Sequence, residues 1–223
     1  MEKPPSIYRY MQFEHLLDLL SNYRLPLINP SCWEDKNDAL STKLSCKKDE
    51  IIGICCFTIS GANSIYRWSK MAKNNLCVRV EFDRKLIENN LHDKIKLYEV
   101  QYKSKDDLDN GCLQSISDCA FLKSTPYAQE KEIRLVMRCT KDEKTNKKIV
   151  GYLEKLPTNT IKNIRFSPFL DREFFPLIRK YLQRQLDDCK WENVTISCSK
   201  ILNMIKWKNS LRKAVKKLQE NKK

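Results

Sequence analysis

The sequence has few of the residues on which common enzyme sites are built. It contains 4 glycines and 2 histidines in 223 residues, and neither G-x-x-x-x-G-K-[ST] nor G-x-G-x-x-G occurs. The usual glycine-rich phosphate-binding loops are therefore excluded. His15 and His92 lack a second ligand at metal spacing and no C-x-x-C is present, so we expect no metal site and no Ser-His or Cys-His catalysis.

Long hydrophobic segments are also missing. The longest apolar run, Ile51 to Phe57, is far too short to cross a bilayer, and the N-terminal MEKPPSIYRY has no apolar signal region. We expect a cytoplasmic protein with no membrane partner. Its 10 cysteines are then reduced thiols that pack as small apolar side chains.

Positive charge is abundant, and it is concentrated near the C-terminus. The chain has 42 Lys and Arg against 28 Asp and Glu, a net charge of +14. Such a surface attracts nucleic acid or an acidic protein partner. Residues 199–223 form an expected basic helix with an apolar stripe and a single acid, Glu220. The candidate nucleic-acid or partner-binding residues there are Lys206, Trp207, Lys208, Arg212, Lys213, Lys216 and Lys217.

The hydrophobic patterns predict one α+β domain over residues 1–198. Leu76 to Phe82 alternates strictly, as a half-buried strand does, and Ile51 to Ile59 is typical of a strand buried on both faces. Gln12 to Tyr23 has helical apolar spacing. Strands and helices do not alternate regularly, so we expect a twisted, mostly antiparallel β-sheet core with peripheral helices.

The sequence also predicts the local structure of two less regular segments. Leu25 to Asp38 contains Pro26 and Pro30, which favours a surface loop. Leu113 to Lys123 is expected to be a helix.

The sharpest local signal is the string Glu130-Lys131-Glu132-Ile133-Arg134. In a strand, Glu130, Glu132 and Arg134 share one face while Ile133 points into the core. When two carboxylates lie close together, repulsion raises the pKa of one, and a nearby guanidinium keeps the other ionised. Such a pair can supply one proton donor and one proton acceptor. The string alone is more typical of a solvated strand face with a local ion pair.

Two other clusters offer polar and aromatic groups. An arginine between tyrosines suits phosphate binding and ring stacking, and hydroxyls at the end of the buried strand can orient a polar ligand, although such groups commonly only satisfy the backbone. The candidate residues are Tyr8, Arg9, Tyr10, Thr58, Ser60 and Trp68.

Taken in order, these strings resemble an uncharacterised bacterial domain-of-unknown-function family that is common in mobile elements and phage-defence loci. The matching strings are Tyr8-Arg9-Tyr10, Pro30-Ser31-Cys32-Trp33-Glu34-Asp35, Cys56-Phe57-Thr58, Trp68, Val80-Glu81-Phe82-Asp83 and Glu130-Lys131-Glu132-Ile133-Arg134. The resemblance implies other defence-system components as partners. This chain departs from the family pattern after Asp35, where Asp38 is the residue able to supply the family's loop carboxylate.

The early arginine, the hydroxyl strand and the final Glu-x-Glu also resemble the sites of ADP-ribosyltransferases. That resemblance implies NAD as the substrate cofactor and a split, twisted β-sandwich. It implies that Glu132 binds the ribose 2′-hydroxyl and stabilises the oxocarbenium-like transition state, while Glu130 prepares the acceptor. The implied cofactor-binding group is Tyr8, Arg9, Tyr10, Thr58, Ser60, Trp68 and Arg134.

Three functions are therefore weighed. The first is an NAD-dependent transferase or toxin of a bacterial anti-phage defence system, acting on a nucleic-acid or protein acceptor. The second is a non-enzymatic module whose basic surface binds nucleic acid or a partner and whose Glu-x-Glu-x-Arg forms an ion-pair network. The third is a metal-dependent nuclease, which needs distant carboxylates brought together, namely Glu34, Asp35, Asp38, Glu130 and Glu132.

Overall fold

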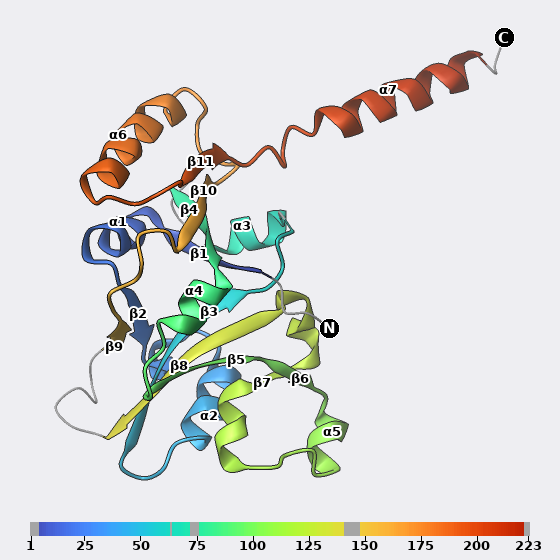
Figure 1. Cartoon of the computed structure of the whole chain (residues 1–223). Helices are drawn as coiled ribbons and strands as arrows, with labels where there is room; N and C mark the ends of the chain where they lie inside the picture. The colour runs from blue at the N-terminus through green and yellow to red at the C-terminus, as the bar shows by residue number, and fades with distance from the viewer. Residues whose placement is uncertain (1–4, 63, 72–75, 141–147, 221–223) are drawn as a thin grey trace.

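The core is a nine-stranded, mostly antiparallel sheet. The computed structural model describes residues 5–62, 64–71, 76–140 and 148–220, with the backbone alone at residues 71, 206, 216–218 and 220 (Figure 1). Along the main path the strands are β11 (Thr195–Cys198), β10 (Ile161–Phe166), β4 (Cys77–Asp83), β1 (Ser6–Gln12), β3 (Glu50–Thr58), β2 (Leu25–Ile28) and β9 (Ile149–Leu153). Strand β8 (Glu132–Thr140) pairs with β3, and β5 (Ile95–Glu99) pairs with β8. Only β10 and β11 run parallel in this sheet, so the predicted α+β class is confirmed.

The sheet divides between β1 and β3. These strands pair at one position only, Tyr8 with Thr58. On its other edge, β3 pairs with β8 along its whole length, from Glu50 opposite Thr140 to Thr58 opposite Glu132. The part containing β1, β4 and β10 therefore diverges from the part containing β3, β8 and β5. The expected twisted and split sheet is present, and the divergence leaves room for a pocket.

Two helices cover the hydrophobic face of the β1–β4–β10 part. The predicted helix over Gln12 to Tyr23 is α1 (Phe13–Asn22), which buries Leu16, Leu19 and Leu20. Helix α6 (Phe175–Asp188) buries Leu182 and Leu186 on the same core. The Trp191 indole N–H donates to the carbonyl of Leu20 at 2.9 Å and fixes the chain after α6 against α1.

Two segments differ from the expected local structure. Leu25 to Asp38 is not only a loop: it forms β2, the 3-10 turn η1 (Pro30–Cys32) and the start of α2 (Lys36–Leu44). Pro26 is tolerated because it lies where β2 pairs with β9 alone. The helix expected over Leu113 to Lys123 is shorter, a 3-10 helix, η2 (Ile116–Phe121), and a short strand follows it.

The remaining elements are short and surround the sheet. They are α3 (Ile65–Met71), α4 (Arg84–Asn89), β6 (Gln101–Lys103), α5 (Lys105–Asp109), β7 (Leu122–Ser124) and the 3-10 helix η3 (Thr125–Glu130). Strands β6 and β7 form a separate parallel pair beside β8.

The cysteines are free thiols. The prediction that they pack as core residues holds for Cys55 and Cys77, which are buried, whereas Cys32 is exposed and the others are half-buried. Burial raises the pKa of Cys77 to about 12.

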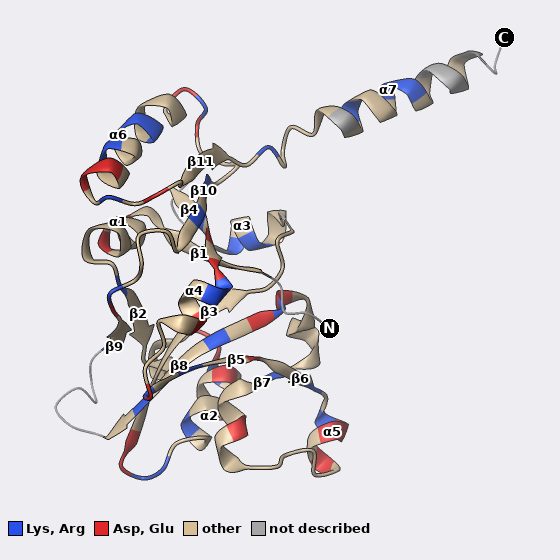
Figure 2. Ribbon diagram, viewed as in Figure 1, with Lys and Arg blue, Asp and Glu red and all other residues tan. Residues whose placement is uncertain are grey.

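The C-terminal segment forms the expected helix, α7 (Ile205–Glu220), which extends away from the rest of the molecule (Figure 1). Lys and Arg are distributed along α7, and no acidic side chain is coloured on its described residues (Figure 2). The division into a domain of residues 1–198 and a separate helix of 199–223 stays a prediction. Within the described ranges, none of the helices is both long and apolar enough to pass through a bilayer.

Candidate active site

A pocket of about 440 Å³ opens where β1 and β3 diverge. It is bounded by β1, β3, α3, η3 and the segment around α2. Six of the predicted site residues line it: Tyr8, Arg9, Tyr10, Thr58, Glu130 and Glu132. The structure thus brings together residues separated by more than half of the sequence.

The register of three strands places the central residues of the pocket in one row. Tyr8 on β1 lies opposite Thr58 on β3, and Thr58 lies opposite Glu132 on β8. Directly opposed residues have neighbouring side chains, about 5 Å apart at Cβ. The row therefore sets an aromatic ring, a hydroxyl and a carboxylate side by side at the split.

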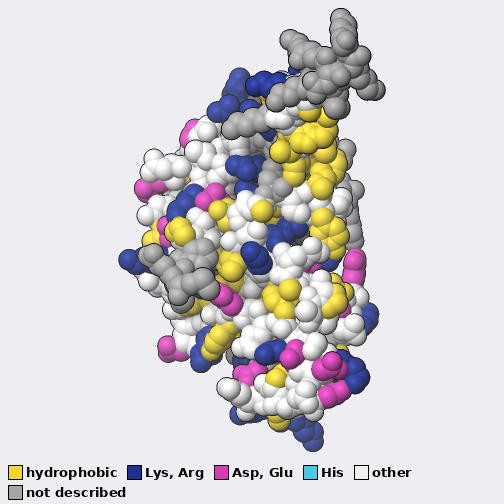
Figure 3. Space-filling model, turned by 90° about the vertical axis from the view of Figure 1, so that its right-hand side faces the viewer, with side chains coloured by type: hydrophobic (Ala, Val, Ile, Leu, Met, Phe, Trp, Pro, Cys, Tyr) yellow, Lys and Arg dark blue, Asp and Glu magenta, His cyan; other side chains and the backbone are white. Residues whose placement is uncertain are grey.

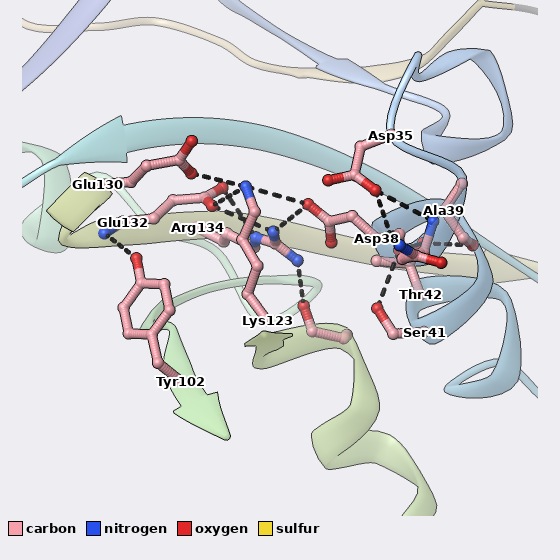
Figure 4. Close-up of polar contacts among 12 residues, drawn as sticks. Asp35, Asp38, Ala39, Ser41, Thr42, Tyr102, Lys123, Glu130, Glu132 and Arg134 are labelled. Atoms are coloured by element: carbon pink, nitrogen blue, oxygen red, sulfur yellow. Dashed lines mark hydrogen bonds and ion pairs between the residues drawn. The ribbon is translucent and has the colours of Figure 1, made fainter. Parts of the chain in front are cut away.

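Lys123 on β7 is the centre of a buried ion cluster beside this row (Figure 4). Its Nζ lies 2.7 Å from Glu130 Oε2, 3.2 Å from Glu132 Oε2 and 3.5 Å from Asp38 Oδ2. Arg134 Nε donates to Glu132 Oε1 at 2.9 Å, and its Nη2 donates to Asp38 Oδ2 at 2.7 Å. Asp38, Glu130 and Glu132 thus share Lys123, Arg134 joins Asp38 to Glu132, and the more exposed Lys70 adds a pair with Glu130 at 3.6 Å.

Burial and the two cations set the ionisation of this cluster. Burial alone would raise the pKa of Glu132, but Arg134 and Lys123 outweigh it and hold that pKa below its usual value. Burial opposes the charge on Lys123, yet Glu132 and Glu130 raise the pKa of its ammonium well above the ordinary range. Glu132 is therefore an ionised, fixed carboxylate at neutral pH. Asp38 differs, because burial raises its pKa by more than Arg134 and Lys123 lower it.

Glu130 reaches the cluster from a different local structure than predicted. It ends η3 rather than lying in a strand, and β8 begins only at Glu132. Lys131 between them has φ +45°, a left-handed turn that interrupts the strand alternation. The predicted common face of Glu132 and Arg134 is confirmed by their hydrogen bonds, whereas a strand position for Glu130 is wrong.

Arg67 on α3 ties the pocket walls together. Its Nη1 donates to Thr58 Oγ1 at 2.8 Å, and its Nη2 donates to the carbonyls of Gln129 and Glu130 at 2.8 Å each. The Thr58 hydroxyl donates to the Glu130 carbonyl at 2.7 Å. This hydroxyl is therefore engaged within the protein, where it fixes Glu130 beside Glu132.

Arg9 is held at the inner end of the pocket. Its Nη1 donates to the carbonyl of Cys56 at 2.8 Å and to Cys55 Sγ at 2.9 Å. A guanidinium has several N–H donors, and the described bonds use only those on Nη1. Arg9 is thus oriented by β3 while it lines the cavity.

Three of the predicted cofactor-binding residues do not line the pocket: Ser60, Trp68 and Arg134. Trp68 is fully buried and packs edge-on against Tyr10, with ring centroids 4.9 Å apart, so it supports the Tyr10 ring from behind. Arg134 is also fully buried and acts on the pocket through Glu132 and Asp38. Ser60 donates its backbone N–H to Thr58 Oγ1 at 3.1 Å.

Sequence patterns alone missed three contributors, Lys123, Arg67 and Lys70, the last of which lines the pocket and pairs with Glu130. None of them belongs to a motif, and Lys123 is the last residue of a segment predicted only as a helix. Asp38 was recognisable as the carboxylate that follows the departure from the family loop, and it does join the site.

The predicted nucleic-acid or partner-binding residues lie on α7, away from this pocket. Trp207, Lys208, Arg212 and Lys213 are exposed, while the side chains of Lys206, Lys216 and Lys217 lie outside the described part.

Three of the carboxylates that a metal-dependent nuclease would need do lie close together, but they surround the side-chain cations of Lys123 and Arg134. Asp38, Glu130 and Glu132 meet at Lys123, and Asp35 instead caps α2 by accepting from the backbone N–H groups of residues 37 and 38. Across the residues that the structure describes, no group of three or more His, Cys, Asp or Glu side chains is placed to hold a metal ion. The arrangement is that of an ion-pair cluster.

The ionisation of Glu132 predicts how stability responds to acid. Its folded-state pKa lies below the ordinary 4.5, so its stabilising effect is present above that pH and is lost as the pH falls through the folded-state value. We expect the free energy of unfolding, measured with urea from about pH 5 to about pH 3, to fall less steeply in Glu132→Gln than in the wild type. An identical slope in both proteins would show that Glu132 has an ordinary pKa.

Comparison with known proteins gives structural neighbours only. No family model and no curated protein matches the chain, so the resemblance to the domain-of-unknown-function family stays a prediction. Among solved structures, DarT from Thermus sp. 2.9 in complex with NAD+ is similar, with a TM-score of 0.45, 11% identity and coverage of 89% of this chain and 97% of that chain. The same protein with carba-NAD+ gives a TM-score of 0.46, 12% identity and coverage of 90% and 98%. The same protein in complex with ADP-ribosylated ssDNA gives a TM-score of 0.45 and 11% identity, with coverage of 89% of this chain and 96% of that chain.

Proposed function

We propose that the protein is an NAD-dependent ADP-ribosyltransferase in which Glu132 is the catalytic carboxylate. The observation that carries this proposal is the row of Tyr8, Thr58 and Glu132 across the split sheet, with Glu132 ionised and fixed at the edge of the pocket. Arg9 faces the same cavity with donors available for a pyrophosphate. An aromatic wall, a cation and a carboxylate are the groups that such a substrate requires.

The proposed reaction depends on the negative charge of the Glu132 carboxylate. As the bond between the ribose and nicotinamide breaks, nicotinamide leaves with the bonding electrons and positive charge develops on the ribose. Glu132 stabilises that charge more strongly than it stabilises the neutral ground-state ribose. Because Arg134 and Lys123 fix the carboxylate in advance, it needs no reorganisation when the charge forms.

Glu130 occupies the position of the acceptor-activating group. Its carboxylate lines the pocket, and its side chain is 21% exposed, more open than that of Glu132 at 8%. An acceptor hydroxyl or amine forms the new bond to the ribose carbon and gives its proton to this carboxylate. Tyr8 and Tyr10 offer rings on which nicotinamide can stack.

The acceptor and the biological setting belong to the same proposal. The net charge of +14 favours an anionic acceptor, either nucleic acid or an acidic protein surface. The family resemblance favours a cytoplasmic toxin that acts with other components of an anti-phage defence system.

The direct test is release of nicotinamide from NAD by the purified protein, with RNA, single-stranded DNA, duplex DNA or cellular protein as acceptor. We expect turnover with at least one of them. Absence of both NAD binding and turnover under all these conditions would contradict the proposal and favour a non-enzymatic binding module.

Arg9 provides a separate prediction on binding. Replacing Arg9 with Gln removes one of the cations that line the pocket, and we expect the dissociation constant for NAD, measured by calorimetry, to rise about tenfold. Arg24→Gln is the matched control, since Arg24 pairs with Asp18 on the surface away from the pocket. Equal NAD affinity in Arg9→Gln and Arg24→Gln would show that Arg9 does not bind NAD.

A further inference from the structure

Helix α7 presents an apolar stripe that nothing in the described part of the molecule covers. On α7 the stripe consists of Trp207, Leu211 and Val215, which are four residues apart and therefore lie on one side of the helix, and Met204 comes just before α7 begins. These side chains are between 45% and 61% exposed. In Figure 3, which views the molecule from the side toward which α7 points, hydrophobic side chains gather next to the grey end of the chain.

The stripe continues into a hollow at the base of the helix. This hollow, about 620 Å³, lies between the end of β11 and the start of α7 and is lined by Ile201, Met204 and Ile205 together with Arg165 and Lys200. Apolar surface flanked by cations thus runs from the domain onto the helix. Isolated helices of this length are marginal in water, so a partner that covers the stripe also stabilises the helix.

Charge decides which partner fits. Between Lys200 and Lys223 there are nine Lys or Arg and a single acid, Glu220. A second copy of α7 would bring like charges together along the stripe and is disfavoured for that reason. Leu177 and Tyr181 on α6, and Phe174 just before it, are also apolar and exposed, but they are no better as a docking site within the chain, because exposed Arg179 and Arg184 lie on the same helix.

Nucleic acid would neutralise the positive charge of α7, but it would not cover the apolar stripe. Its backbone needs only cations, with aromatic rings for stacking, and Trp207 is the one aromatic residue in α7. Leu211, Val215 and Met204 would stay in water on such a ligand. An apolar groove with an acidic rim satisfies both features, as in proteins that bind an amphipathic helix in a groove.

We propose that α7 is a docking helix for an acidic protein partner, which receives Trp207, Leu211 and Val215 in an apolar groove and pairs its rim with Lys208 and Arg212. This interaction is independent of NAD chemistry, because α7 contributes no residue to the pocket at the split sheet.

The test uses the full chain and a fluorescently labelled synthetic peptide of about four heptads, with Leu at the a and d positions and Glu at the flanking positions. We expect saturable binding by anisotropy that weakens with salt. Leu211→Asp should weaken binding by about tenfold or more, because it places a charge in the apolar contact. Asn209→Asp adds the same residue on the opposite side of α7 and should stay within about twofold of the wild type.

Several results would overturn the proposal. One is the absence of peptide binding, and another is an equal loss in Leu211→Asp and Asn209→Asp, which would mean that charge alone is recognised. Binding to phosphatidylglycerol vesicles or to a single-stranded oligonucleotide, with none to the peptide, would assign α7 to a membrane or to nucleic acid instead. Nicotinamide release by Leu211→Asp should equal that of the wild type, which separates this proposal from the proposed enzymatic function.

Discussion

Glu132→Gln is expected to lower NAD turnover by at least about 100-fold while NAD binding is retained. The substitution keeps the shape of the side chain and removes the negative charge that would stabilise the ribose cation. Its effect should therefore appear in kcat rather than in the dissociation constant. Nicotinamide release under single-turnover conditions, together with calorimetric NAD binding, measures the two quantities separately.

The fold should tolerate this substitution because each cation of the cluster keeps another carboxylate. Without the charge at position 132, Lys123 still pairs with Glu130 and Asp38, and Arg134 still pairs with Asp38. Lys70 pairs with Glu130 and not with Glu132, so it is unaffected.

Glu173→Gln, a change at an exposed carboxylate before α6, is the matched control and should turn over NAD as the wild type does. Unchanged turnover in Glu132→Gln would refute the proposed catalytic role, and the cluster would then be structural only.

Arg134→Met is expected to lower the free energy of unfolding by about 3 to 5 kcal/mol. The Arg134 side chain is fully buried and donates to Glu132, to Asp38 and, through Nη1 at 2.8 Å, to the carbonyl of Ala120. Removing it leaves two buried carboxylates short of a partner and one buried carbonyl unsatisfied. Urea unfolding followed by circular dichroism measures the loss.

A surface pair provides the comparison for this stability prediction. Arg24 and Asp18 are about one-third exposed, and their ion pair spans 2.8 Å. Solvent screens such a pair, so Arg24→Met should cost much less than Arg134→Met. A cost for Arg134→Met as small as that for Arg24→Met would mean that the cluster contributes little to the fold.

These two variants separate the enzymatic and the structural roles of the same cluster. The ion-pair network that a non-enzymatic protein would need is present in the structure, since Arg134 joins Glu132 to Asp38. A network with only a structural role predicts a stability loss at Arg134 and no chemical effect at Glu132. The proposed transferase predicts both effects.

The sequence by itself determined the features that depend on local periodicity. Strict alternation in Leu76 to Phe82 located β4, and the helical spacing in Gln12 to Tyr23 located α1. Alternation also put Glu132 and Arg134 on a common face, which their hydrogen bonds confirm. These features follow from the repeat of a strand or a helix, which acts over a few residues.

Only the tertiary structure decided which distant groups meet. Lys123 carries no local pattern and Asp38 was recognisable only through the family loop, yet the pairing of β3 with β8 and the packing of α2 beside η2 and β7 bring both to Glu132. Trp68 lies in a recognisable motif, but packing against Tyr10 buries it. Hydrophobic periodicity records which face of an element is buried, whereas long-range strand register and side-chain packing determine what that face contacts, and this is why the ion cluster around Lys123 became visible only in the folded chain.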